Sequence, residues 1–304
     1  MRRITKRRKS RRSGKQNSFK KLKCSPSKTD RTSFSCYSSN DLIKIRDAWN
    51  KRHSDRFIHS EDDHEIWNII KRYSINSCKN EQCWLSSLFK KNELDDSLLL
   101  YTFSPTRPDK WKNNPNTWLS SLDIEAVMNQ YERKYKNFSF IGCSPIDFDK
   151  RLHNGECVWP ELCNFDINEY YNNGVNKIGI SLNLDKHTQD GSHWVSLFVD
   201  LKNKYIFYFD SNGDETPKEV KTLMDKINNQ CLKLGIEMKI FESDIEHQKK
   251  NTECGIYSIY FLTYLLKNNN YNHFLDKRIS DEEMFEHRNK SVSYTHLTLP
   301  TTEA

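Results

Sequence analysis

Apolar residues in the first half of the chain recur at helical spacing. Leu42, Ile45 and Trp49 lie three or four positions apart, and residues 66–70 continue this type of pattern. Such spacing places the apolar side chains on one face of a helix. The sequence therefore predicts a short helical domain over residues 41–104.

Residues 105–119 contain three prolines and predict a connector between two folded parts. Directly after it, Ser120 or Ser121 could cap a helix. Ile124 and Val127 begin the apolar face of that helix. We expect this helix to open a second domain.

The apolar pattern changes to that of strands in the second half of the chain. Residues 177–184, 193–200 and 204–211 are rich in β-branched and aromatic residues, which favour strands. A helix is predicted over 217–234, a short strand over 237–241 and a further helix from Cys254 onward. The segment "KNFSFIGCSPIDFD" is interpreted as packing residues or as a wall that leads to a cleft. This order predicts an α+β fold with a mostly antiparallel sheet flanked by helices.

The positive charge of the chain is concentrated at its N-terminus. The 304 residues carry a net charge of +7, but residues 1–23 contain twelve Lys or Arg and no Asp or Glu, so the remainder is near −5. A run of like charge cannot bury enough apolar surface to fold. We expect a disordered basic tail over residues 1–40, with non-specific nucleic-acid binding through residues 1–23 as an alternative role.

Composition limits the class of protein. At 36% hydrophobic residues the chain can bury one sizeable core. No apolar run approaches the roughly 20 residues that span a bilayer, and the charged N-terminus does not resemble a secretory signal. Nine cysteines in such a chain favour reduced thiols and an intracellular, reducing compartment. We therefore expect no membrane partner.

The cysteines do not predict a metal site. Cys78 and Cys83, with His64 nearby, lack the Cys-x2-Cys pair that is typical of zinc sites. We interpret these two thiols, and likewise Cys157 and Cys163, as small hydrophobic residues. No metal and no cofactor is expected.

Two predicted strands bring a histidine next to a carboxylate. If residues 200–203 form a tight loop, Val199 pairs with Lys204 and His193 lies directly opposite Asp210. Opposed residues hold their Cβ atoms about 4.5–5.5 Å apart, which suits an imidazole–carboxylate hydrogen bond. Such a bond fixes the tautomer that a general base needs.

A candidate nucleophile follows later in the chain. Cys254 begins an apolar helix in "HQKKNTECGIYSIYFL", and the positive end of a helix favours a thiolate. His193 would take the thiol proton and later return it to the leaving amine. The side-chain amide of Gln248, six residues earlier, could hold an oxyanion together with the Cys254 N–H group. Asn251 is the rival donor.

Together these residues resemble a known family. "GSHWVSLFVD", "YFDSNG", "HQKKNTECGIYSIYF" and "KRISDEEM" are similar to motifs of the Ulp1-type cysteine proteases, and most resemble the branch of large nucleocytoplasmic DNA viruses that includes the African swine fever virus proteinase. The resemblance covers residues 120–288 and implies a papain-like core. It implies that His193 is the base, Asp210 the orienting acid, Cys254 the nucleophile and Gln248 the oxyanion donor.

The resemblance also implies a substrate. Such enzymes cleave after Gly-Gly, which passes through a narrow channel, and Trp194 is the candidate channel wall; Trp159 is a weaker candidate upstream. We expect a thiol endopeptidase that matures viral structural polyproteins in the host cytoplasm or virus factory, with packaging into the virion as an option. The alternative within this chemistry is a protease that removes SUMO or another ubiquitin-like modifier.

A third hypothesis belongs to a different class of protein. In it the chain is an inactive binding module that its basic tail recruits to nucleic acid. The presence of His, Asp, Gln and Cys in the expected order argues against it. The Thr-rich final segment, residues 289–304, does not continue the pattern of the domain and is interpreted as non-native or disordered.

Overall fold

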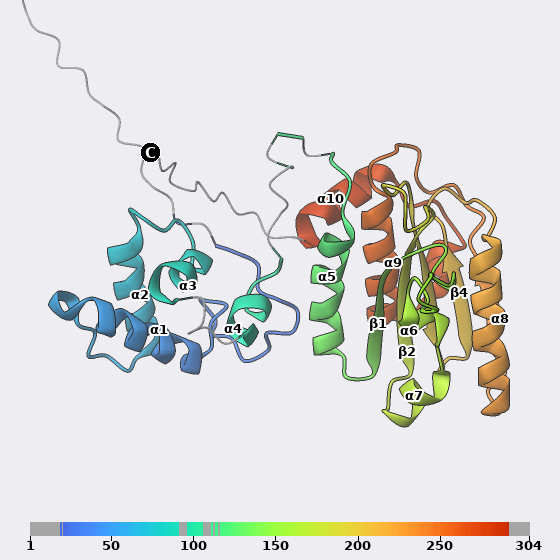
Figure 1. Cartoon of the computed structure of the whole chain (residues 1–304). Helices are drawn as coiled ribbons and strands as arrows, with labels where there is room; N and C mark the ends of the chain where they lie inside the picture. The colour runs from blue at the N-terminus through green and yellow to red at the C-terminus, as the bar shows by residue number, and fades with distance from the viewer. Residues whose placement is uncertain are drawn as a thin grey trace, which may run out of the picture. The chain divides into compact units, whose positions relative to one another are not determined.

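The structure is a computed structural model that describes residues 19, 21–90, 96–105, 111, 113, 114 and 116–291 (Figure 1). The chain divides into two compact units. The first comprises residues 1–22 and 32–95, and the second comprises residues 23–31 and 96–304. Residues 1–18 and 20 of the predicted basic tail and residues 292–304 of the predicted C-terminal tail lie outside the described residues.

The first unit is helical, as the spacing of its apolar residues predicts. Leu42, Ile45 and Trp49 form the buried face of its first helix, and Ser38 caps that helix in a capping box with Asp41. A capping box satisfies backbone N–H groups that have no partner within the helix. The helices of this unit are α1 (Ser39–Arg52), η1 (Ser54–Arg56), α2 (Asp63–Ser74) and α3 (Gln82–Leu88).

Residues 32–38 of this unit are packed, which corrects the expectation of a disordered tail up to residue 40. Tyr37 is fully buried, and its hydroxyl donates to the Glu81 carbonyl at 2.8 Å. The Glu81 carboxylate accepts hydrogen bonds from Ser35 Oγ at 3.0 Å and Trp67 Nε1 at 2.6 Å. A buried carboxylate needs such partners. These long-range contacts order the segment, and a count of local charge could not reveal them.

The structure also corrects the expectation that four of the cysteines are free thiols. Cys78 is joined to Cys83, and Cys157 to Cys163, in disulfides. Their separations of five and six residues are short enough for each bond to close a small loop. Among the described residues, no group of three or more His, Cys, Asp or Glu could hold a metal ion.

A five-stranded mixed sheet forms the centre of the second unit (Figure 1). Its order follows the chain, β1-β2-β3-β4-β5. The central pairs β2–β3 and β3–β4 are antiparallel as expected, whereas both edge strands pair in parallel with their neighbours. The strands are β1 (Phe138–Pro145), β2 (Lys177–Asn183), β3 (Trp194–Asp200), β4 (Tyr205–Phe209) and β5 (Lys239–Glu242).

Strand β1 is the element that the sequence pattern did not identify as a strand. Its pairing with β2 shifts register between Ile141 and Cys143, so one residue is inserted there. Such a bulge interrupts the alternation of apolar and polar positions by which a strand is recognised. The segment packs, as expected, but it does so as an edge strand of the sheet.

Helices cover both faces of the sheet (Figure 1). One apolar cluster lies between the sheet and α5, α9 and α10, and a second lies between the sheet and α6–α8. Ser120 caps α5 in a capping box with Asp123. The helices of this unit are α4 (Asp96–Tyr101), α5 (Ser121–Lys134), α6 (Pro160–Cys163), α7 (Ile167–Asn172), α8 (Lys218–Lys233), α9 (Cys254–Asn268), η3 (Tyr271–Phe274) and α10 (Asp281–Ser291).

The register of the β3–β4 hairpin differs by two residues from the predicted one. Asp200 pairs with Tyr205, so the loop comprises residues 201–204, and the predicted pairing of Val199 with Lys204 is wrong. The Asp200 carboxylate accepts from the Asn203 backbone N–H at 2.8 Å and lies 3.2 Å from the Lys177 ammonium on β2. These contacts hold Asp200 within the sheet rather than in the turn. A shift of two residues leaves every side chain on its predicted face.

Helix α9 is buried along most of its length. The Ser258 hydroxyl lies in its middle, 3.1 Å from the Ser181 hydroxyl on β2 and hydrogen-bonded to the Ser196 hydroxyl on β3. These buried polar contacts fix how far along the sheet the helix begins. Cys254 is therefore held at the end of the sheet where β3 starts. In the part of the chain that the structure describes, no helix has the length and hydrophobicity required to cross a bilayer.

Candidate active site

The predicted imidazole–carboxylate pair is present. His193 Nε2 lies 2.6 Å from Asp210 Oδ1, and Asp210 is buried. The same carboxylate oxygen accepts the backbone N–H of Asn212 at 2.8 Å, in the turn after β4. One carboxylate oxygen of Asp210 thus contacts both the local turn and the histidine.

The third predicted residue also interacts with the imidazole. Cys254 is buried, and its sulfur is one of the groups that act on His193. Burial disfavours a charged imidazole, but the interactions with the Asp210 carboxylate and the Cys254 sulfur outweigh that effect and raise the pKa of His193 to about 10. The three side chains therefore form one contiguous arrangement in which the histidine readily holds a proton at neutral pH.

Gln248, the predicted oxyanion donor, is buried and hydrogen-bonded to Ser211. Its backbone N–H donates to the Ser211 carbonyl at 2.7 Å, and its side-chain Oε1 accepts from Ser211 Oγ at 2.9 Å. With Oε1 held in this way, the Nε2 group is the end of the amide that can donate elsewhere. Ser211 directly follows Asp210 in the sequence, so one turn orients both the acid and the amide. Sequence reasoning did not assign this role to Ser211.

Asn251, the rival donor, is exposed and contributes its backbone instead. Its carbonyl oxygen accepts a hydrogen bond of 2.6 Å from Trp118 Nε1. No side-chain hydrogen bond of Asn251 occurs among the described residues. Of the two candidate amides, Gln248 is buried and has its side chain held by Ser211, whereas Asn251 is exposed.

Trp194 packs close to the start of α9, next to Gly255. Its Nε1 donates to the Leu119 carbonyl at 3.1 Å, which fixes the plane of the ring. A Cβ placed on Gly255 would lie 3.0 Å from Leu119 Cβ and 3.4 Å from Trp194 Cδ1. The start of α9 is therefore already packed closely against Leu119 and the Trp194 ring. A side chain at Gly255 would therefore crowd Leu119 and Trp194 next to Cys254.

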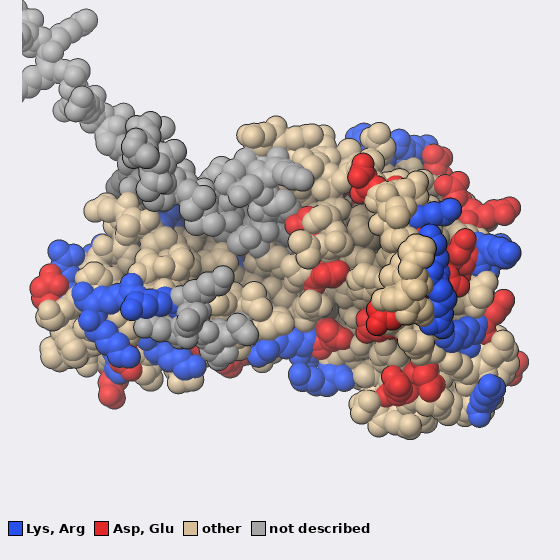
Figure 2. Space-filling view, viewed as in Figure 1, with Lys and Arg blue, Asp and Glu red and all other residues tan. Residues whose placement is uncertain are grey.

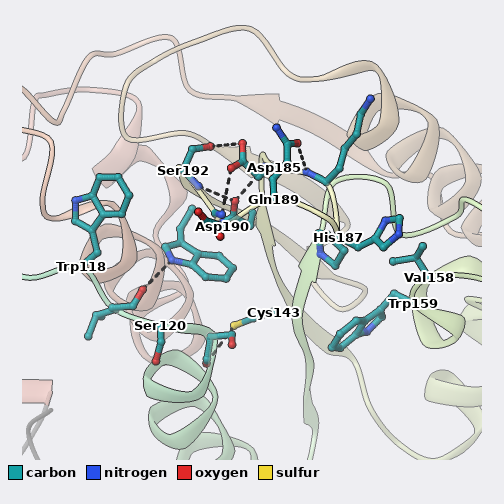
Figure 3. Close-up of a pocket in the computed structure, with 17 residues that line it drawn as sticks. Trp118, Ser120, Cys143, Val158, Trp159, Asp185, His187, Gln189, Asp190 and Ser192 are labelled. Atoms are coloured by element: carbon teal, nitrogen blue, oxygen red, sulfur yellow. Dashed lines mark hydrogen bonds between the residues drawn. The ribbon is translucent and has the colours of Figure 1, made fainter.

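A pocket of about 490 Å³ begins at Trp194 (Figure 3). Trp118 and Trp159 lie at its two sides, and Cys143 lies between them. The structure thus places Trp159, the weaker candidate, at the far side of the pocket from Trp118. Trp118 was not predicted as a site residue, because a tryptophan in a connector belongs to no helical or strand pattern of apolar residues.

The loop between β2 and β3 forms another part of the pocket (Figure 3). In this loop Asp185 accepts hydrogen bonds from the Ser192 hydroxyl at 2.8 Å and the Gly191 N–H at 3.1 Å. His187 contacts Asp147, with its Nδ1 2.8 Å from Oδ2. The loop is therefore tied to itself and to the segment after β1, which gives His187 a partner that the sequence did not reveal.

His247 also has a structural place. It is fully buried next to Gln248, and its Nδ1 accepts the Ile279 backbone N–H at 3.0 Å. Burial lowers the pKa of His247 to about 4, although a hydrogen bond with Phe274 opposes that shift. A neutral histidine here links the segment before Gln248 to the segment before α10.

Comparisons with known proteins agree with this site. Residues 168–300 match the sequence profile of the Ulp1 protease family, C-terminal catalytic domain. Over 288 residues the chain is 28% identical to a candidate thiol protease of Acanthamoeba polyphaga mimivirus, covering 88% of this chain and 91% of that protein. It is 29% identical over 244 residues to a protein of African swine fever virus named as a SUMO-1 cysteine protease, covering 74% and 86%.

The fold agrees as well. A crystal structure of the African swine fever virus protease superposes with a TM-score of 0.63 at 25% identity, covering 90% of this chain and 96% of that one. The family profile includes His193, Asp210, Gln248 and Cys254 within its matched range. Residues 168–300 therefore match the catalytic domain of the Ulp1 protease family, and the protein is a Ulp1-like cysteine peptidase.

Proposed function

We propose that Cys254, His193 and Asp210 form the catalytic triad of this peptidase and that it cleaves peptide bonds that follow Gly-Gly. The observation that carries the triad is the imidazole of His193, which contacts the Asp210 carboxylate through Nε2 and also interacts with Cys254. A nucleophile, a base and an orienting acid in this order form the arrangement that peptide hydrolysis by a cysteine nucleophile requires.

In the first step the Cys254 proton moves to His193, and the thiolate attacks the scissile carbonyl carbon. The raised pKa of His193 favours the imidazolium that this step produces. The Cys254 N–H and the Gln248 side-chain amide then stabilise the oxyanion. Protonated His193 gives its proton to the leaving amine, and a thioester remains on Cys254. Water, deprotonated by His193, hydrolyses the thioester.

The preference for glycine is supported by crowding at the nucleophile. Trp194, Leu119 and Gly255 are already in contact beside Cys254, so little space remains for a side chain on the residue that supplies the scissile carbonyl. A wider pocket follows beyond Trp194, lined partly by Trp118 and Trp159. This shape suits a substrate with glycines at the cleavage site and larger residues upstream.

Two substrates remain compatible with this shape, and we favour a viral structural polyprotein. The similarity to proteins of two large DNA viruses, over 88% and 74% of the chain, supports that choice. A conjugate of SUMO is the second candidate, because the African swine fever virus relative is named as a SUMO-1 protease. The proposal places the enzyme inside the infected cell, in the cytoplasm or virus factory, or packaged in the virion.

A cleavage assay tests the proposal. The protein is incubated with a Gly-Gly-X peptide that copies a cleavage site of a capsid precursor, with the matched Gly-Ala-X and Ala-Gly-X peptides, and with a SUMO conjugate. We expect cleavage of the Gly-Gly-X peptide, at least tenfold slower cleavage of both Ala peptides, and none with Cys254→Ser. Cleavage of the SUMO conjugate alone would reverse the ranking of substrates, and activity in Cys254→Ser would refute the triad.

We also propose that the basic residues 1–23 attract nucleic acid without sequence preference. Twelve positive charges in this segment support the idea, because each neutralised phosphate releases counterions. On the face of the second unit visible in Figure 2, acidic and basic side chains are interspersed, which favours the tail over that face as the attracting element. Deletion of residues 1–23 should abolish salt-sensitive DNA binding and leave peptide cleavage intact.

A further inference from the structure

An arginine of α10 is buried immediately behind the nucleophile. Arg288 is 1% exposed, and its Nε donates to the Glu253 carboxylate at 2.8 Å. Glu253 is 2% exposed and directly precedes Cys254. A buried charge is costly unless it is paired and hydrogen-bonded, so each of these residues depends on the other.

The same guanidinium also binds backbone on two separate segments. Its Nη1 donates to the Thr117 carbonyl at 2.7 Å and its Nη2 to the Thr252 carbonyl at 2.9 Å. The guanidinium carbon lies 4.3 Å from the centre of the Trp111 ring. A planar group with fixed donor directions can join several acceptors at once, which an ammonium cannot do.

These two segments form the two sides of the site. Thr252 leads into Cys254, whereas Thr117 leads into Trp118 and Leu119, which line the pocket. The hydrogen bond from Trp118 to the Asn251 carbonyl joins the same segments nearer the surface. Arg288 is the buried connection between the nucleophile and the pocket wall.

We propose that Arg288 is a positioning residue for the catalytic cysteine: it holds the Cys254 segment and the Thr117–Leu119 wall in register, and it neutralises Glu253 next to the thiolate. The inference rests on the proposed role of Cys254. It assigns a catalytic consequence to α10, an element that contributes no residue to the triad.

The second part of the proposal concerns charge. Without Arg288, the Glu253 carboxylate would stand unpaired one residue from the sulfur and would disfavour a thiolate there. The other charged or titratable groups around Glu253 and Cys254 are His193, Asp210, Lys250, Tyr257, Arg278 and Asp281. None of these is hydrogen-bonded to the Glu253 side chain in the described part of the chain, so Arg288 is the group whose removal most changes the charge next to Cys254.

The experiment compares Arg288→Gln, Arg288→Lys and the double variant Glu253→Gln/Arg288→Gln. Each is measured for kcat and KM on the Gly-Gly-X peptide and for the pH midpoint of iodoacetamide labelling of the Cys254 peptide by mass spectrometry. In Arg288→Gln we expect kcat to fall at least tenfold and the labelling midpoint to rise by about one pH unit. In the double variant the midpoint should return to that of the wild type while kcat stays low.

Arg288→Lys separates the two effects. Its charge still neutralises Glu253, so the labelling midpoint should not move, but one ammonium cannot hold Glu253, Thr117 and Thr252 together, and kcat should fall severalfold. The matched control is Lys250→Gln, which removes an exposed ion pair between the same loop and Glu282 of α10. Exposed pairs of this kind contribute little, so its kinetics should remain those of the wild type.

Wild-type kcat, KM and labelling midpoint in Arg288→Lys and Arg288→Gln would overturn the proposal. If Arg288→Gln does not fold, as judged by circular dichroism, Arg288→Lys decides the positioning role: wild-type kinetics in that variant, even with a lower melting temperature, would mean that Arg288 is only structural. Loss of the proposed function is a different result, because it would appear as retained activity in Cys254→Ser.

Discussion

His193 Nε2 lies 2.6 Å from Asp210 Oδ1 although the two residues are not opposite each other in the β3–β4 hairpin. Ser196 pairs with Phe209 in that ladder, so Asp210 follows the last paired residue of β4 and reaches His193 diagonally. Diagonal neighbours on one face of a sheet are about 7–8 Å apart between backbones, within reach of an imidazole and a carboxylate. The contact therefore survives a register that the sequence did not predict.

This contact leads to a prediction about pH. Asp210 holds the imidazolium of His193, whose pKa is raised to about 10, so the wild-type kcat/KM should stay high at moderately alkaline pH and fall as His193 loses its proton near pH 10. Asp210→Asn removes the negative charge, which lowers the pKa of His193. The alkaline limb of the kcat/KM profile should then move to lower pH, and kcat at neutral pH should drop by ~10²-fold.

Asp147→Asn is the matched control, because it changes the carboxylate of the other His–Asp contact of this unit, that with His187. Its alkaline limb should coincide with that of the wild type. An unchanged limb in Asp210→Asn would show that another group sets the alkaline pH dependence.

The oxyanion assignment makes a prediction about two amides. Gln248→Ala should lower kcat by about 10²–10³-fold with little change in KM, because the donor acts on charge that develops in the transition state. Asn251→Ala should keep kcat within about twofold, since its carbonyl and not its side chain bonds to Trp118. Steady-state kinetics of both variants decide the matter, and a larger loss in Asn251→Ala would exchange the roles.

Gly213 supports the loop that carries Gln248. Its φ is +75°, and an added Cβ would lie 2.8 Å from the backbone of Ile245 and Glu246. Gly213→Ala should therefore lower the free energy of unfolding by ~2 kcal/mol or more and reduce kcat, because residues 244–248 must move. Chemical denaturation and steady-state kinetics measure the two effects.

Gly174→Ala is the control that separates the cost of backbone strain from the cost of close contacts in Gly213→Ala. Gly174 has φ of +78°, and no atom lies within 4 Å of the position that its Cβ would take. This variant should show the strain cost alone and wild-type kinetics. Equal destabilisation in the two variants would remove the packing argument for Gly213.

His247 should make the fold sensitive to acid. Burial lowers its pKa to about 4, against about 6.5 in an unfolded chain, so the unfolded state binds the proton first as pH falls. Stability is fully retained above about pH 6.5 and should decline by roughly 3 kcal/mol toward pH 4 from this residue alone. In His247→Gln, urea denaturation between pH 7 and 4 should show a smaller decline; a slope equal to that of the wild type would assign the acid sensitivity to other groups.

Several features of this protein were predictable from local sequence. Periodicity identified the buried faces of α1 and α5, and the residue types of β2, β3 and β4 identified them as strands, because both signals arise within a few neighbouring residues. His193, Asp210 and Cys254 were likewise marked by their place at element ends, and Gln248 by its spacing of six residues from Cys254. Local spacing did not predict β1, whose bulge interrupts the strand pattern. It also did not predict the register of the β3–β4 hairpin, where Asp200 is hydrogen-bonded to Asn203.

The sequence by itself determined which side chains can do chemistry here and which elements carry them, since residue type and periodicity are properties of short segments. Tertiary structure decided how they meet: Trp118 and Trp159 on one pocket, Ser211 on the Gln248 amide, and Arg288 behind Glu253. The hydrogen bond from Arg288 to the Thr117 carbonyl joins residues 171 positions apart. Their energy depends on burial and on satisfied hydrogen bonds, which exist only once the whole sheet and its helices have packed.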